Sequence, residues 1–176
     1  MNKPLLLPGL AAVAAVLTAC ETAREPAGGP PMPLINSAGQ NIGTVVAWQT
    51  TGGVSFRIRA SGLPHGVHGI HVHPIGRCDP PDFATAGTHW NPGGKQHGLN
   101  NPNGPHAGDM PNVTVAANGV LAETVVLPHA AMADLLDADG SSIMIHANAD
   151  DYVSQPAGNS GPKIACAVIG PAPALR

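Results

Sequence analysis

A pair of histidines one residue apart is the first candidate for chemistry in this sequence, in the segment GIHVHPIGRC at residues 69–78. In a β-strand alternate side chains point to the same face, so His71 and His73 would present two imidazoles side by side. Ile70 and Val72 would then face a hydrophobic core. Two neighbouring imidazoles suit a metal that takes nitrogen ligands at about 2 Å, but two solvated histidines on a polar strand face would give the same pattern.

Four further candidate ligands lie in residues 78–110, a segment dominated by Gly, Pro, Asn and His. A loop of this length is uncommon unless it carries function or is held by something. Its histidines and one aspartate, His89, His97, His106 and Asp109, can complete a tetrahedral zinc shell that is closed to solvent and therefore structural. Such a shell would also order a loop that has no hydrophobic core. The alternative is a polar loop with scattered histidines.

Short strands are expected to position these side chains. The chain has 22 Gly and 19 Pro, and only 11% of its residues are charged, which is typical of strands joined by many turns. In residues 54–60 apolar residues alternate with Ser55, Arg57 and Arg59, which we expect to face outward. Besides this strand and the histidine strand, we expect strands at 41–49, 112–116, 120–127, 142–147 and 163–169, and a helical turn at 132–136. The spacing predicts an antiparallel sandwich or barrel with two long loops, 78–110 and 146–162.

The N-terminal segment indicates export. Lys3 precedes an apolar run over residues 5–17, as in a secretory signal, and the ending LTAC resembles the bacterial lipobox. Cys20 would then be the lipidated first residue of the mature protein, and Glu21 favours the outer membrane. The alternative is an ordinary secretory signal with a chance cysteine.

The sequence therefore divides into a signal peptide (1–19), a lipidated flexible tether (20–33) to which we assign no structure, and one domain (34–176). The net charge of −3 gives no reason to expect a nucleic-acid partner.

Five segments together resemble the copper/zinc superoxide dismutases of the bacterial, periplasmic kind. They are GIHVHPIGRC (69–78), THWNPGGKQHG (88–98), PHAGDMPN (105–112), MIHANADDY (144–152) and GNSGPKIAC (158–166), in the family's order. The resemblance extends over residues 34–170. It implies an all-β, Greek-key antiparallel sandwich or barrel of the immunoglobulin-like kind with two long functional loops.

The resemblance also implies the ligands of two metals. Copper would be bound by His71, His73, His89 and His146, and zinc by His89, His97, His106 and Asp109. His89 would bridge the two metals. Asp150 matches the carboxylate that joins a copper ligand to a zinc ligand, and His68 matches a histidine that hydrogen-bonds backbone. His65 and His129 match no ligand, and we expect both at the surface.

The activity implied is the dismutation of superoxide to O2 and hydrogen peroxide, with redox-active copper, structural zinc and proton delivery by His89. Lys163 stands where the family has arginine, and Ala167 stands where the family has glycine. Lysine keeps the charge that guides the anion but is a flexible point donor, so we expect an active enzyme. The alternatives are a copper/zinc-binding lipoprotein that buffers metal with little turnover, and a purely structural domain of the same fold.

The resemblance further implies a disulfide between Cys78 and Cys166, against the alternative of two buried free thiols. With Cys20 lipidated, the three cysteines fit an oxidising compartment. We expect the protein in the bacterial cell envelope, facing the periplasm, with superoxide and the membrane as its partners. The sequence allows either a monomer or a homodimer.

Overall fold

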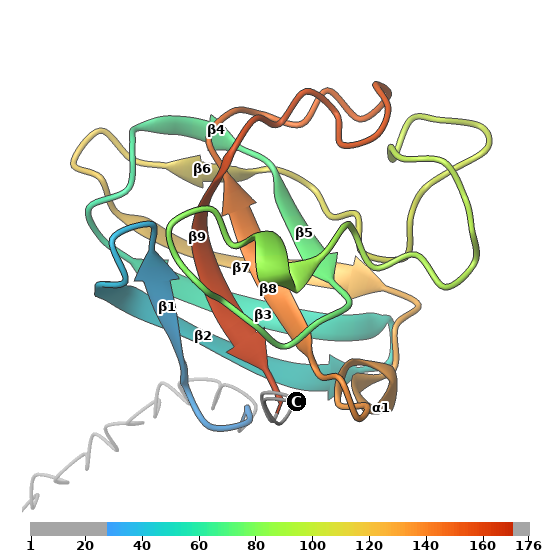
Figure 1. The fold of residues 1–176 in the computed structure, drawn as a ribbon, viewed down its shortest axis with the longest axis horizontal. Coiled ribbons are helices and arrows are strands. Elements are labelled where there is room, and N and C mark those ends of the chain that lie inside the picture. Colours follow the sequence, from blue (N-terminus) through green and yellow to red (C-terminus); the bar gives the residue numbers. More distant parts are fainter. Residues whose placement is uncertain (1–27, 171–176) are drawn as a thin grey trace, which may run out of the picture.

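The computed structural model describes residues 28–170 (Figure 1), so the predicted signal peptide, Cys20 and most of the predicted tether lie outside the described residues. The strands are β1 (Met32–Asn36), β2 (Asn41–Thr50), β3 (Gly53–Ala60), β4 (Gly66–His68), β5 (Ile70–His73), β6 (Val113–Val115), β7 (Leu121–Pro128), β8 (Ser141–His146) and β9 (Lys163–Ile169). A 3-10 turn covers Ala84–Ala86, and the helix α1 covers Met132–Leu135. No helix in the described range is long and apolar enough to span a membrane.

Seven strands form one antiparallel sheet in the order β5-β8-β9-β1-β2-β3-β7, and β4 pairs with β6. Only Gly69 separates β4 from β5, and β6 lies against β7, so the small pair connects the two edges of the large sheet (Figure 1). The chain crosses between β3 and β4 and between β7 and β8 without pairing these successive strands, as Greek-key folds do. The predicted all-β antiparallel sandwich or barrel is confirmed.

The alternation in β3 buries Val54, Phe56 and Ile58, as predicted. Ser55 lies on the opposite face of the strand from Val54 and Phe56, as predicted, but it is buried there, with only 4% exposure. Ser55 lies between its larger cross-strand neighbours on β2 and β7, Trp48 and Val126, which can cover a small hydroxyl.

Strand β1 begins at Met32, so the predicted start of the ordered domain at Leu34 is late. Met32 and Pro33 pair with β2, whereas β9 pairs with β1 only from Ile35 onward. Pro33 therefore lies where one edge of β1 is unpaired, and a residue without an N–H is tolerated there.

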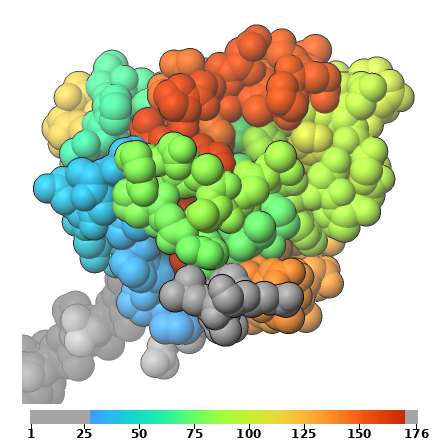
Figure 2. Space-filling model, viewed as in Figure 1, coloured from blue at the N-terminus to red at the C-terminus, as the bar shows by residue number. Residues whose placement is uncertain are grey.

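Two long loops cover one face of the sheet and position the candidate site. Residues 74–112 join β5 to β6, and residues 147–162 join β8 to β9, in agreement with the two loops predicted. Figure 2 shows the first loop, in green, meeting the second, in red-orange, on this face.

The first loop has a small hydrophobic cluster of its own. Phe83 and Ala86 are buried against Met144 and Cys166, and the disulfide between Cys78 and Cys166, with a Cα–Cα distance of 5.6 Å, ties the loop to β9. The predicted disulfide is confirmed. The expectation that this loop has no hydrophobic core is wrong, because Phe83 and Ala86 are buried in a small cluster.

Candidate metal centre

Strand β5 presents His71 and His73 on one face, and both are buried, with exposures of 0% and 1%. They are therefore not the solvated pair that the sequence left open. In each ring one nitrogen binds the protein: His71 Nε2 lies 2.7 Å from Asp150 Oδ2, and His73 Nδ1 lies 2.9 Å from the carbonyl oxygen of Gly87.

His146 ends β8, and it too binds the protein through one ring nitrogen, since its Nδ1 lies 3.0 Å from the carbonyl oxygen of Gly161. The other nitrogens, His71 Nδ1, His73 Nε2 and His146 Nε2, are buried and have no hydrogen-bond partner among the described residues. A buried polar atom without a partner costs about 1–3 kcal/mol. Three such atoms on neighbouring rings fit nitrogen ligands of one metal, which would use the free lone pairs.

His89, from the first loop, lies between these rings and a second group of ligands. Its ring stacks on His71 with centroids 3.9 Å apart, and one ligand atom of each of His73, His89 and His146 lies within 4.8 Å of the others. Its Nδ1 faces the other way, 3.0 Å from Asp109 Oδ1. The two nitrogens of one imidazole therefore serve two adjacent sites.

The second site consists of His89, His97, His106 and Asp109. Asp109 Oδ1 lies 3.0, 3.1 and 3.4 Å from the Nδ1 atoms of the three histidines, in that order, and the Nδ1 atoms of His89 and His106 are 3.4 Å apart. Four ligands at about 2.0 Å from a tetrahedral zinc ion are separated by about 3.3 Å. The donor set therefore has the chemistry and the spacing of a zinc site.

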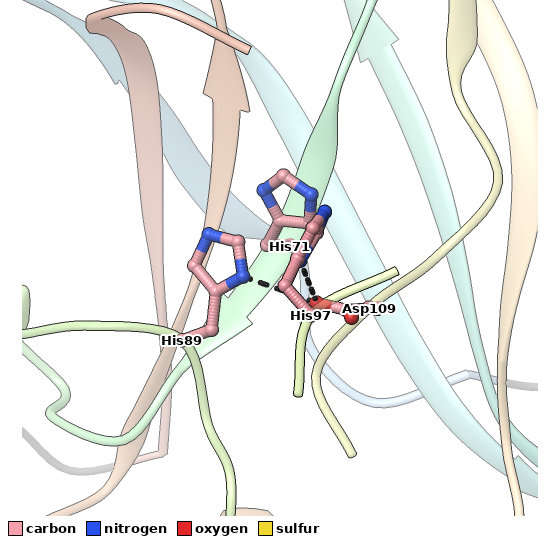
Figure 3. Close-up of side chains that lie close together, drawn as sticks. All are labelled: His71, His89, His97 and Asp109. Carbon is pink, nitrogen blue, oxygen red and sulfur yellow. Dashed lines mark hydrogen bonds and ion pairs between the residues drawn. The ribbon is translucent and has the colours of Figure 1, made fainter. Parts of the chain in front are cut away.

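His71 also lies near this second group, and Figure 3 shows its ring beside His89, His97 and Asp109. We assign it to the first site because Asp150 occupies its Nε2, and His106 supplies the fourth ligand at the second. The copper ligands are thus His71, His73, His89 and His146, and the zinc ligands are His89, His97, His106 and Asp109, as predicted.

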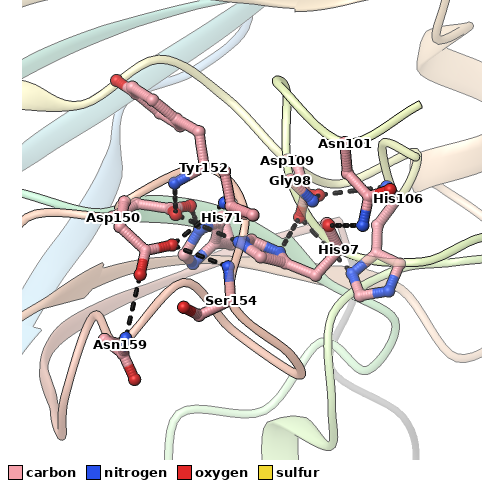
Figure 4. Close-up of polar contacts among 12 residues, drawn as sticks. His71, His97, Gly98, Asn101, His106, Asp109, Asp150, Tyr152, Ser154 and Asn159 are labelled. Carbon is pink, nitrogen blue, oxygen red and sulfur yellow. Dashed lines mark hydrogen bonds and ion pairs between the residues drawn. The ribbon is translucent and has the colours of Figure 1, made fainter. Parts of the chain in front are cut away.

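Asp150 connects the two sites (Figure 4). Its Oδ2 accepts from His71, and its Oδ1 lies 3.0 Å from His97 Nε2 and accepts the backbone N–H of Tyr152 at 2.7 Å. The carboxylate thus fixes which nitrogen of each ring faces the metal.

The electrostatics of the protein favour metal binding by the copper ligands and by Asp109. Burial lowers the pKa of His71 to about 4, of His146 to about 3 and of His73 to about 2, so these rings are neutral at physiological pH. Burial alone would raise the pKa of Asp109, but hydrogen bonds from His89 and His97 outweigh it and hold that pKa well below its usual range. Neutral imidazoles and an ionised carboxylate are the forms that metals bind. His97 differs, because hydrogen bonds to Asp109 and Asp150 outweigh its burial and raise its pKa to about 9, so zinc would have to displace a proton there.

Lys163, at the start of β9, lies in a cleft of about 870 Å³ between the two long loops, which His73, His89 and His146 also line. Its Nζ donates to the carbonyl oxygens of Phe83 and Gly87 at 3.0 and 3.1 Å. Burial lowers the pKa of Lys163. An ammonium has three donors, so two carbonyls leave one for a ligand in the cleft.

The remaining histidines are not ligands. His68 Nδ1 lies 2.8 Å from the carbonyl oxygen of His146, and its Nε2 lies 2.8 Å from that of Pro64, so this ring binds backbone as expected. His65 and His129 are exposed, as expected for surface histidines.

Sequence reasoning did not identify the backbone groups that orient the copper ligands. The carbonyl oxygens of Gly87 and Gly161 hold His73 and His146, and both glycines have positive φ, 79° and 75°. Gly158 is a third glycine with positive φ at the site, and it is needed for a different reason, because a Cβ there would overlap Asp150. The only signal in the sequence is glycine close to a ligand, which is weak in a glycine-rich chain.

Comparison with known proteins gives a consistent result. The family model described as copper/zinc superoxide dismutase matches residues 41–169. "Superoxide dismutase [Cu-Zn] 1" of Aquifex aeolicus is 44% identical over 142 residues, covering 77% of this chain and 84% of the relative. "Superoxide dismutase [Cu-Zn]" of Caulobacter vibrioides is 39% identical over 138 residues, covering 74% of this chain and 79% of the relative.

Solved structures agree in fold. A superoxide dismutase-like protein from Bacillus subtilis has a TM-score of 0.78 at 38% identity, covering 81% of this chain and 99% of that one. The Cu/Zn superoxide dismutase from Brucella abortus has a TM-score of 0.69 at 32% identity, covering 80% and 98%.

Proposed function

The chain belongs to the copper/zinc superoxide dismutase family, and we propose that it works in the bacterial cell envelope. Lys163 would guide the anion to the metal site, and a lipid on Cys20 would hold the protein at a membrane. The reaction of the family converts two superoxide anions and two protons into O2 and hydrogen peroxide. The observation that carries this function is the set of three buried, unpartnered imidazole nitrogens beside His89. Bound copper would supply the one-electron chemistry, and bound zinc would be structural.

His89 is proposed to deliver a proton. Its Nδ1 lies on the zinc side, 3.0 Å from Asp109 Oδ1, where bound zinc would hold it, and the other ring nitrogen, Nε2, is on the side of the copper ligands. A ring held at one nitrogen keeps its orientation while the other nitrogen gains and loses a proton. Nε2 would thus pass a proton to the peroxide that forms in the cleft.

Lys163 is proposed to draw superoxide into the cleft and hold it there. Its ammonium shares the cleft with three copper ligands, which supports this role. A cation at the mouth of a site raises the rate of anion capture, and this effect weakens as salt screens the charge. The two carbonyl contacts limit the freedom of the lysine, and they partly replace the rigidity that arginine would bring.

Steady-state rates of metal-loaded variants test this role. We expect Lys163→Arg to raise kcat/KM modestly, because the fork of donors docks an anion better, and Lys163→Glu to lower it by about tenfold or more, because the charge is reversed. The wild-type rate should fall as ionic strength rises.

Metal content measured on the same samples separates catalysis from storage. A fully metallated wild-type protein without turnover would support the metal-buffering alternative. If kcat/KM is unchanged by both substitutions and by ionic strength, the protein is still a superoxide dismutase, but Lys163 does not guide the anion.

A further inference from the structure

The cleft above the copper ligands carries two opposite charges. Apart from its histidines, the described residues that line it include one cation, Lys163, and one anion, Asp82. Their formal charges cancel. Bound copper and zinc would add positive charge to this site, and Asp82 offsets part of the attraction that these charges and Lys163 provide for an anionic substrate.

Asp82 is also built into the loop that holds Lys163. Its Oδ1 accepts the backbone N–H of Ala84 at 3.0 Å, which closes a turn at the start of the 3-10 segment Ala84–Ala86. The residue inside this turn is Phe83, whose carbonyl oxygen accepts from Lys163 Nζ. The buried ring of Phe83 and the turn that Asp82 closes together fix the position of this carbonyl.

Asp82 and Lys163 interact electrostatically without forming an ion pair within 4.0 Å in the described part of the chain. The Lys163 ammonium is therefore held by carbonyls, and the carboxylate acts on it, and on an approaching anion, through space. Because Asp82 is exposed, its effect should depend strongly on salt.

We propose that Asp82 is a positioning and rate-setting residue of this enzyme: its carboxylate charge weakens the capture of superoxide, while its Oδ1 closes the turn that aims Lys163. This inference rests on the proposed role of Lys163. It divides the effect of one side chain into a charge, which opposes the reaction, and a hydrogen bond, which supports it. The two parts can be separated by substitution.

Asp82→Asn removes the charge and keeps an oxygen that can accept from Ala84, whereas Asp82→Ala removes both. We expect the asparagine variant to raise kcat/KM about two- to threefold at low ionic strength and to steepen its salt dependence. The gain should shrink near 0.15 M salt, where the Debye length is about 8 Å. The alanine variant should gain less than the asparagine variant, or lose activity.

Azide binding to the Cu(II) protein, followed by its absorption, provides a readout other than turnover. The dissociation constant of azide should fall in Asp82→Asn and rise in Lys163→Gln. Asp137→Asn is the matched control, because Asp137 is also exposed and its Oδ1 also accepts the N–H two residues on, at 3.1 Å, but it does not line the cleft. We expect this control to change neither quantity.

Three results would overturn the inference: no gain in Asp82→Asn, an equal gain in Asp137→Asn, or equal behaviour of the asparagine and alanine variants. A Lys163→Gln variant that keeps wild-type rate and azide affinity would instead remove the proposed role of Lys163. The two failures are therefore distinguishable.

Discussion

At the scale of single residues, the metal centre depends on which ring nitrogen each histidine gives to the protein. His71 binds Asp150 through Nε2, whereas His73 and His146 bind carbonyl oxygens through Nδ1. A fixed partner on one nitrogen sets the tautomer and aims the other nitrogen at the metal. Asp150 affects both metal sites, because it binds one ligand of each metal, His71 and His97.

Asp150→Asn should therefore weaken the binding of both metals. The amide has one acceptor oxygen where the carboxylate has two, and it loses the charge, so we expect copper and zinc affinities to fall by about 10- to 100-fold each. Competition with chelators measures both. Asp151→Asn is the control, because the neighbouring carboxylate accepts from Val153 and Asn159 and contacts no ligand. Loss of one metal alone would show that Asp150 does not couple the sites.

His89 and His97 should behave differently when removed. His89→Ala deletes a ligand of both metals, so copper and zinc binding should fall together. His97→Ala should mainly lose zinc, because its Nδ1 faces only Asp109. Metal analysis and the Cu(II) spectrum with and without zinc measure this. Independent titration of the two metals, without spectral change, would contradict a shared imidazolate.

At the scale of elements, the two long loops meet over β5, and glycine permits the close approach. Gly158, in the second loop, has φ 63°, and a Cβ there would overlap Asp150 Oδ1 and lie 2.7 Å from His97 Nε2. The backbone of one loop therefore packs directly on the hydrogen bond that joins the metal sites.

Gly158→Ala should disturb the zinc site and destabilise the fold by about 2–4 kcal/mol, from steric overlap and an unfavourable φ. Gly94→Ala separates these causes, because Gly94 has nearly the same φ, 61°, and no atom within 4 Å of an added Cβ. We expect this control to cost about 1 kcal/mol and to keep its zinc. Thermal unfolding and zinc content measure both variants. Equal effects would show that the contact with Asp150 is unimportant.

Strand β3 was predictable because apolar and polar residues alternate along it, and the apolar segment of β9 matches the predicted range 163–169. The ligands were predictable because histidine and aspartate at these spacings match a known family. The loop geometry was not, because carbonyl oxygens have no sequence signature. The contacts of Gly87 with His73 and Lys163 depend on how two distant segments pack, and alternation alone could not show that Ser55 is covered by its neighbours.

At the scale of the whole molecule, the cleft and the start of the described chain lie at different ends. Strand β9 runs from Lys163 at the cleft to Ile169, near the end where both termini of the described chain lie (Figure 1). Gly29 N–H donates to the carbonyl oxygen of Ala47 at 2.9 Å, which fixes the entry of the chain on β2. An anchor that precedes Gly28 would therefore be attached at the end of the domain opposite to the cleft.

Anchoring itself is the prediction that belongs to this scale. An extended chain from Cys20 to Gly28 reaches at most about 28 Å, so a lipid on Cys20 would keep the domain close to the membrane. More than one acyl chain gives stable anchoring, so the wild type should sediment with membranes, and Cys20→Ala should be soluble or unprocessed. The purified alanine variant should keep its activity, because the disulfide uses Cys78 and Cys166. Mass spectrometry of the N-terminal peptide identifies the lipid. A wholly soluble wild type without acyl mass at Cys20 would contradict the anchor and leave the enzyme unchanged.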